Sequence, residues 1–154
     1  MSTRAVKILK QKNVVFEIVK YDHKEKGAAF AASATGFPLA QTIKTLVVDL
    51  GNRSYCMALM SGMMQLDLKK VAFVFGVKNA KMADPATAQR LTGYLIGGIG
   101  PFGSKQNLPV VMEITLMAYE TVLINAGQRG TLLKMSPNDI AANLNCRISP
   151  IASI

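Results

Sequence analysis

The stretch IKTLVVDL (Ile43–Leu50), followed by the pair Gly51-Asn52 and then by SYCMALMS (Ser54–Ser61), decides the fold class of this chain. Both runs are rich in aliphatic and β-branched residues, which favour strands. A Gly-Asn pair between two such runs is typical of a tight turn that joins antiparallel strands. The stretch therefore predicts a β-hairpin, and the rest of the fold is built outward from it.

Helical and strand-like segments are interspersed on both sides of this hairpin. Helices are predicted over Arg4–Lys12, around Phe30, and after the start signals Asp67, Asp84-Pro85 and Ser136-Pro137. Strands are predicted over Val14–Val19, Tyr94–Ile96, Pro109–Ile114, Thr121–Asn125, Thr131–Met135 and Cys146–Ile151, and a loop over Asp22–Lys26. Because several strand-like runs neighbour each other, we predict an α+β fold with a mixed sheet, in a single domain covering residues 1–154.

Composition narrows the possible functions. Hydrophobic residues make up 50% of the chain and charged residues 18%, as in a folded domain. No apolar run is long enough to span a bilayer and no signal peptide is evident, so we expect a cytoplasmic protein without a membrane partner. Cys56 and Cys146 lie far apart and form no motif, so we expect no metal and no cofactor. The net charge of +9 fits either an anionic partner such as nucleic acid or a merely soluble basic surface.

The segment GGIGPFG (Gly97–Gly103) contains four glycines, which need a structural or functional explanation. The spacing matches a dinucleotide-binding fingerprint, but no helix can begin in the following SKQNLP. It also matches the glycines of a P-loop, but Ser104-Lys105 reverses the required order of lysine and hydroxyl residue. Two interpretations remain. The segment is either a tight structural connection or a loop whose amide N–H groups bind an anionic or carbonyl oxygen.

Lys44 stands out within the first strand of the hairpin. Because side chains alternate along a strand, it shares a face with the aliphatic Leu46, Val48 and Leu50. The side chain either extends past them to water or places a cation at the mouth of an apolar pocket.

Four other residues are candidates for binding a substrate. His23, in the triplet YDH, has no serine or cysteine partner in a recognisable motif, so a catalytic triad is not supported. Tyr21 and Phe30 line a pocket or belong to the core. Arg129, in GQRG, contacts phosphate or lies solvated in a hairpin turn.

The order of these motifs is similar to that of a known family. YDH, IKTLVV, MADPATAQRLTGYLIGGIGPFG, INAGQRG and SPNDI follow one another as in the YbaK family of aminoacyl-tRNA deacylases, which is related to the editing domain of bacterial prolyl-tRNA synthetases. The resemblance runs from about Lys7 to the last strand. It implies a mixed, curved β-sheet flanked by helices.

The resemblance also implies a function and a site. It implies a free-standing enzyme that removes a mischarged small amino acid, cysteine first and alanine next, from tRNA(Pro), with prolyl-tRNA synthetase as a possible partner. The family lysine corresponds to Lys44 and the GxxxP loop to Gly97, Gly98 and Pro101, with Gly100 and Gly103 alongside. The aromatic and histidine positions correspond to Tyr21, Phe30 and His23.

Two residues depart from the family pattern. Many relatives have serine where this chain has Gly100, and the usual serine before G-x-R-G is Asn125 here. These departures bear on the amino acid that is recognised.

Two rival functions remain at this point. A non-catalytic binder of tRNA or nucleotides would use the same lysine and loop as a phosphate clamp. A regulatory protein on an editing scaffold would have lost the chemistry. In the deacylase itself, water or a group of the substrate attacks the ester.

Overall fold

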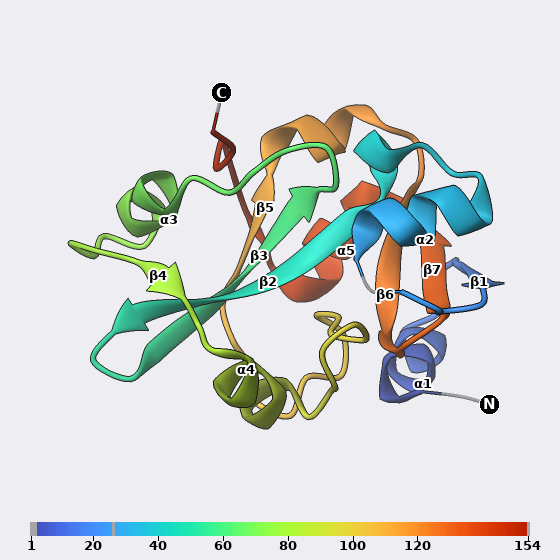
Figure 1. The fold of residues 1–154 in the computed structure, drawn as a ribbon, viewed down its shortest axis with the longest axis horizontal. Helices are drawn as coiled ribbons and strands as arrows, with labels where there is room; N and C mark the ends of the chain where they lie inside the picture. Colours follow the sequence, from blue (N-terminus) through green and yellow to red (C-terminus); the bar gives the residue numbers. More distant parts are fainter. Residues whose placement is uncertain (1–2, 26, 154) are drawn as a thin grey trace.

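The structure, a computed structural model, describes residues 3–25 and 27–153 of the 154-residue chain. The hairpin predicted from the sequence is its central feature (Figure 1). Strand β2 (Ile43–Gly51) pairs antiparallel with β3 (Ser54–Ser61), with Val47 opposite Met57. The turn residues Asn52 and Arg53 both have positive φ angles, as the mirror-image turn of a two-residue hairpin requires.

Two sheets are built around this hairpin. The larger is mixed, because β3 pairs parallel with β5 and β5 pairs parallel with β8, whereas β2 pairs antiparallel with its neighbours. Its order is β4 (Lys81–Met82), β2, β3, β5 (Val110–Glu113), β8 (Arg147–Ser149). The smaller is antiparallel, with the order β1 (Glu17–Lys20), β7 (Thr131–Met135), β6 (Val122–Gln128). A single parallel bridge between Thr42 and Leu123 joins the two sheets.

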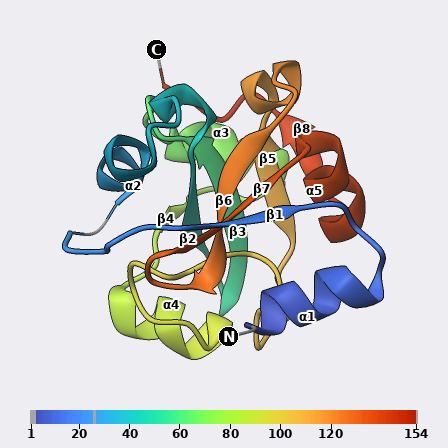
Figure 2. The same ribbon diagram turned by 90° about the vertical axis from the view of Figure 1, so that its right-hand side faces the viewer.

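Short helices surround the sheets (Figures 1 and 2). They are α1 (Arg4–Gln11), α2 (Ala28–Thr35), α3 (Leu68–Val74), α4 (Pro85–Thr92) and α5 (Pro137–Leu144), with 3₁₀ turns at Leu39–Gln41 and Ile114–Ala118. The side chains of Asp67, Asp84 and Ser136 accept amide hydrogen bonds in the first turns of α3, α4 and α5, which confirms the three predicted start signals. No helix within residues 3–25 and 27–153 is long and apolar enough to cross a membrane.

The two faces of β2 pack against different partners, as the alternation of its side chains predicts. Val48 and Leu50 pack with Val71 of α3, whereas Val47 packs with Leu91 of α4. Because its faces are covered by different helices, β2 divides the interior into separate clusters. The α+β class and the mixed sheet are confirmed, and the sheet strands fall into two groups joined at one bridge.

Two strand predictions were wrong in detail. The strand predicted over Val14–Val19 begins only at Glu17, because the N–H of Val14 still completes the end of α1 by donating to the carbonyl of Leu9. Residues 94–96 form no strand, because the chain turns at Gly93, where φ is +77°, and the Tyr94 hydroxyl then donates to the carbonyl of Phe102 at 2.6 Å. The predicted loop after Asp22 includes Lys26, which lies outside the described residues.

Candidate functional site

A pocket lies where the two sheets separate. Beyond the bridge between Thr42 and Leu123, β2 and β6 diverge, and the wedge between them forms a cavity of about 340 Å³. Lys44 and Asn125, each two residues past the bridge on its own strand, lie on opposite sides of this wedge. Residues Ile96, Gly97 and Ile99 cover it from the loop, and helix α2 contributes Ala28 and Ala31. Tyr21 and Leu132 also line it, so the described lining comes from six separate segments of the chain.

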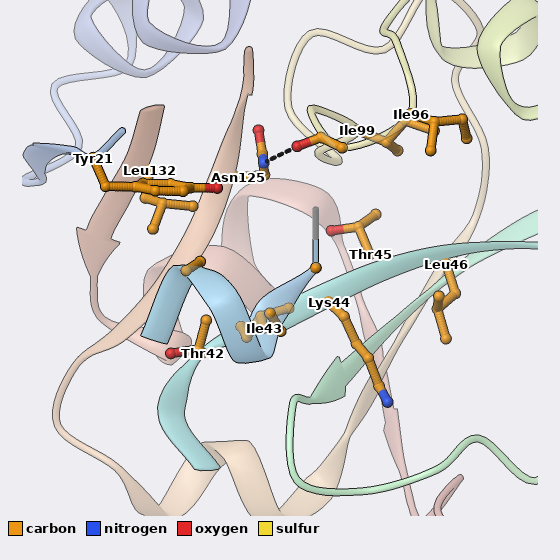
Figure 3. A pocket seen from close by; sticks show the side chains of 14 residues that line it. Tyr21, Thr42, Ile43, Lys44, Thr45, Leu46, Ile96, Ile99, Asn125 and Leu132 are labelled. Atoms are coloured by element: carbon orange, nitrogen blue, oxygen red, sulfur yellow. Dashed lines mark hydrogen bonds between the residues drawn. The ribbon is translucent and has the colours of Figure 1, made fainter. Parts of the chain in front are cut away.

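Lys44 lies at the rim of this pocket. In Figure 3 its ammonium end points away from Asn125 and Ile99, while the neighbouring Thr45 points toward them. Partial burial lowers the pKa of Lys44 below its usual 10.5, because an ammonium group loses hydration in a half-buried position. No described carboxylate forms an ion pair with Lys44. The site therefore holds a cation that no neighbouring anion neutralises.

The loop over the pocket contributes main-chain groups. The N–H of Gly98 donates to the carbonyl of Leu95 at 2.8 Å, which closes a turn and occupies that donor. The N–H groups of Gly97 and Ile99 have no acceptor among the described residues of the chain. Gly97 has a φ of +92°, a conformation that side chains rarely adopt. The N–H of Gly98 is therefore used within the turn, whereas Gly97 and Ile99 line the pocket and keep N–H groups without an acceptor in the described chain; the catalytic role of Gly97 and Gly98 stays a prediction.

The other glycines of the loop are needed for packing. A Cβ atom at Gly98 would lie 2.9 Å from the main-chain nitrogen of Arg129, and one at Gly100 would collide with the carbonyl oxygen of Asn125. At Gly103, where φ is +72°, a Cβ would lie 2.6 Å from the hydroxyl of Tyr94. Gly98 and Gly100 let the loop lie directly on the backbone of β6 and its turn, and Gly103 lets it lie against Tyr94 and helix α1. The interpretation as a structural connection therefore applies to these three residues.

Asn125 fastens the loop to β6. Its Nδ2 donates to the carbonyl of Gly97 at 3.2 Å (Figure 3), and its Oδ1 accepts from the N–H of Gly127 at 3.0 Å. The two departures from the family pattern therefore touch each other, because Gly100 packs on the main chain of Asn125.

The predicted aromatic residues lie together on the side of the pocket formed by the smaller sheet. Tyr21 lines the pocket, and its ring centroid is 6.3 Å from that of Phe30, which supports Tyr21 without lining the pocket. Burial raises the pKa of the Tyr21 phenol, so the hydroxyl is neutral and able to donate at neutral pH. Phe30 is therefore placed behind the binding surface, in contrast to the prediction.

His23 and Arg129 lie in a smaller recess of about 120 Å³ that adjoins the pocket. Tyr21 and Gly97 line both spaces. Arg129 is fixed there, because its Nε donates to the carbonyl of Ile96 at 2.7 Å.

Three predicted binding residues lie elsewhere. Pro101 and Gly103 line a separate cavity on the other side of the loop, next to Ile8 and Lys12 of the N-terminal segment. Gly100 is buried beneath the loop against β6. These positions fix the shape of the loop and do not line the pocket.

The pocket offers little acid–base or metal chemistry of its own. Its described lining contains no cysteine, serine, histidine or carboxylate. Burial raises the pKa of Cys56 and of Cys146 to about 12, so neither thiol ionises near neutral pH. No group of three or more histidine, cysteine or acidic side chains within the described ranges is arranged to hold a metal ion.

Sequence reasoning missed Thr45 and Ile99 as lining residues. The hydroxyl oxygen of Thr45 is buried and has no hydrogen-bond partner among the described residues. Because side chains alternate along a strand, Thr45 and Lys44 were expected on opposite faces of β2. Both line the same pocket because this part of β2 is an unpaired edge of the sheet. That edge was not evident from the sequence.

Comparisons with known proteins agree on one family. Residues 23–142 match the model of the aminoacyl-tRNA editing domain. The chain is 28% identical over 153 residues to EbsC of Enterococcus faecalis, which is provisionally named a Cys-tRNA(Pro)/Cys-tRNA(Cys) deacylase. This alignment covers 98% of this chain and 93% of EbsC. It is 29% identical to ProXp-y of Escherichia coli, a multifunctional Ser/Thr-tRNA deacylase, over 80% of this chain and 76% of the relative.

A solved structure extends the agreement to the fold. A crystal structure provisionally described as a trans-editing enzyme for prolyl-tRNA synthetase superposes with a TM-score of 0.86 at 25% identity, covering 100% of this chain and 99% of that one. The resemblance inferred from the sequence motifs is thereby confirmed. The chain belongs to the aminoacyl-tRNA editing domain family, as a relative of the YbaK-like deacylases.

Proposed function

We propose that this chain is an aminoacyl-tRNA deacylase that removes a mischarged small amino acid, cysteine first and alanine next, from tRNA(Pro). The observation that carries the proposal is the wedge pocket, which has Lys44 at its rim and is lined on the loop side by Gly97 and Ile99, whose N–H groups have no acceptor among the described residues. The names of the relatives support the reaction class, since both describe deacylases of aminoacyl-tRNA.

The substrate is an ester between an amino acid and a ribose hydroxyl at the end of the tRNA. Attack on the ester carbonyl places negative charge on its oxygen, and the amide N–H groups of Gly97 and Ile99 are the donors available to stabilise it. A well-placed donor of this kind contributes about 3–4 kcal/mol to the transition state. Lys44 positions the substrate through a single anionic or carbonyl oxygen, which suits a compact ammonium group.

Because the described lining of the pocket contains no cysteine, serine, histidine or carboxylate, the attacking group in this proposal is water or a group of the substrate. With water, a bond forms between water oxygen and carbonyl carbon, and the bond to the ribose oxygen breaks. The products are the free amino acid and a tRNA with its terminal hydroxyl restored. Because the protein supplies position and electrostatic stabilisation, the absence of a triad in the sequence is consistent with this reaction.

The size of the side chain that fits follows from the lining. Ala28 and Ala31 of α2 and Ile43 of β2 give an apolar wall, and the hydroxyl of Tyr21 gives a polar contact. This combination suits a small side chain with or without a weakly polar atom. Prolyl-tRNA synthetase remains the partner that we propose for presenting the tRNA.

A deacylation time course tests the proposal. Proline tRNA charged with cysteine, alanine, serine, threonine or proline is mixed with the protein and with the Lys44→Ala variant. We expect selective loss of cysteine or alanine, slowed on the order of 100-fold in the variant because the ester is no longer positioned. Retention of every ester, with tRNA still bound, would instead identify a non-catalytic tRNA-binding module.

A further inference from the structure

The small recess beside the pocket is not explained by recognition of the amino acid. It is lined by Tyr21, His23, Lys24, Glu25, Gly97 and Arg129, and it shares Tyr21 and Gly97 with the main pocket. Any group that enters the recess is therefore adjacent to the ester. Three of its side chains are basic or imidazole groups, and Glu25 is its carboxylate.

Arg129 is the fixed element of this recess. Its Nε donates to the carbonyl of Ile96 at 2.7 Å, and its main-chain nitrogen lies against Gly98. The terminal nitrogens of the guanidinium have no hydrogen-bond or ion-pair partner among the described residues. A guanidinium that is anchored through Nε and free at its other two nitrogens presents parallel donors to an anion with little loss of side-chain freedom.

His23 is exposed and lies beside the same hairpin turn. The ring lies so close to the hairpin turn that a Cβ atom at Gly130 would be 2.5 Å from its Nδ1. Gly130 has a φ of +79°, and its carbonyl accepts from the N–H of Tyr21 at 3.0 Å, which ties the YDH segment to the turn that carries Arg129. Lys24 forms only an exposed contact with Asp22, at 3.9 Å, so its charge adds to the recess with little neutralisation.

We propose that this recess binds the 5′-phosphate of the nucleotide that carries the aminoacyl ester, with Arg129 as the main donor and His23 and Lys24 as supporting donors. This inference rests on the proposed function. The amino acid and the phosphate are attached to the same ribose, so a substrate whose ester lies under Gly97 has its phosphate within reach of a neighbouring space. The recess, at about 120 Å³ against about 340 Å³ for the pocket, suits a compact anion better than a base.

Binding of stable amide analogues tests this without relying on catalysis. The ligands are 3′-alanylamido-3′-deoxyadenosine and its 5′-phosphate, measured by calorimetry at low salt. We expect the phosphate to increase affinity about tenfold or more, as charge-assisted hydrogen bonds do, and this advantage to shrink as salt is added. Equal affinity for the two analogues, or binding of neither, would overturn the proposal.

Variants assign the phosphate to the recess. Arg129→Gln should remove most of the phosphate advantage, taken as the ratio of the affinities of the two analogues for the same variant, and Lys24→Gln should reduce this ratio less. Arg129→Lys should restore part of it, because the charge returns without the planar pair of donors. Arg53→Gln, in the β2–β3 turn on the opposite side of the molecule (Figure 1), is the charge-matched control and should keep the full advantage.

Two further arms separate the alternatives. Inorganic phosphate should bind far more weakly than the phosphorylated analogue; equal binding would indicate a general anion site and overturn the assignment. Deacylation of aminoacyl-tRNA is measured in parallel. Deacylation together with equal binding of the two analogues would contradict the phosphate assignment but not the proposed function. Phosphate-dependent binding without deacylation would contradict the proposed function but not the phosphate assignment. An advantage retained in Arg129→Gln would show that Arg129 only anchors the loop.

Discussion

The two halves of the Gly97–Gly103 loop face different surroundings. In the first half, Gly97 and Ile99 line the pocket, and their N–H groups have no acceptor among the residues that the structure describes. The second half packs inward, with Gly100 on the backbone of β6 and Gly103 against Tyr94 and Arg4. Glycine is required for different reasons along the loop, since Gly97 adopts a positive φ angle whereas Gly98 and Gly100 permit close contact between chain segments. A glycine-rich motif therefore does not by itself identify a binding loop.

The largest effect that separates the two halves should come from Gly100→Ala. The added Cβ would collide with the carbonyl oxygen of Asn125, which is backbone and cannot rotate away. We expect a loss of about 3 kcal/mol in the free energy of unfolding, at the upper end of overpacking in a core. Denaturant unfolding followed by circular dichroism measures this loss.

Gly97→Ala is the matched variant in the other half of the loop. It introduces a side chain at a φ of +92°, where the strain of a left-handed conformation is about 1–2 kcal/mol. We expect this variant to lose less stability than Gly100→Ala but to lose deacylation, because the methyl group is next to the donors at the pocket. Equal losses of stability with full activity in Gly97→Ala would erase the distinction between the halves.

Much of the fold could be predicted because local signals agree with it. The hairpin is specified by two strand-forming runs around Gly51-Asn52, and helix starts are specified by Asp67, Asp84 and Ser136, whose side chains bond the first amides. The strand predicted at residues 94–96 failed for a non-local reason. Tyr94 is buried, and its hydroxyl donates a hydrogen bond to the carbonyl of Phe102 across the loop. The apolar composition of residues 94–96 cannot distinguish this arrangement from a strand.

The site could be predicted only in part. Lys44 was recognisable because a lysine among aliphatic side chains of a strand is unusual, and Gly97 because it belongs to a familiar motif. The involvement of Asn125, Thr45 and Ile99 depends on the separation of β2 and β6 beyond one bridge. That separation joins residues 81 positions apart, Thr42 and Leu123, and no local pattern specifies it.

A smaller effect should follow from changing Asn125, whose side chain bonds Gly97 in the first half of the loop and whose main chain contacts Gly100 in the second half. Asn125→Ala removes the hydrogen bonds to Gly97 and Gly127, for a loss of about 1 kcal/mol in stability. Because the carbonyl of Gly97 is then free to turn, we expect deacylation to fall roughly tenfold through kcat more than through KM. Steady-state kinetics on the aminoacyl-tRNA that the time course identifies gives this division.

Asn125→Asp is the more selective variant of this pair. The carboxylate keeps an acceptor for the N–H of Gly127 but replaces the donor to Gly97 with a second acceptor, which faces a carbonyl oxygen. We expect Asn125→Asp to be at least as impaired as Asn125→Ala in turnover. Activity equal to that of the unmodified chain would show that the contact with Gly97 does not orient the loop.

The smallest expected effect is a pH dependence of stability and of deacylation that arises from the charge of Lys44. Burial lowers its pKa in the folded chain below the usual 10.5, so between these two values the unfolded chain binds more protons than the folded one. The unfavourable contribution of the buried charge is complete below the folded pKa and is relieved as pH rises toward 10.5. Lys44→Met should therefore be slightly more stable than the unmodified chain at neutral pH, and this advantage should shrink at alkaline pH.

Over the same range the enzyme-dependent part of deacylation should fall as the ammonium loses its proton, so stability and activity move in opposite directions. Thermal unfolding and initial rates measured across that range, after subtracting spontaneous ester hydrolysis, test both trends, and activity that is constant up to pH 10.5 would show that the charge of Lys44 is not used.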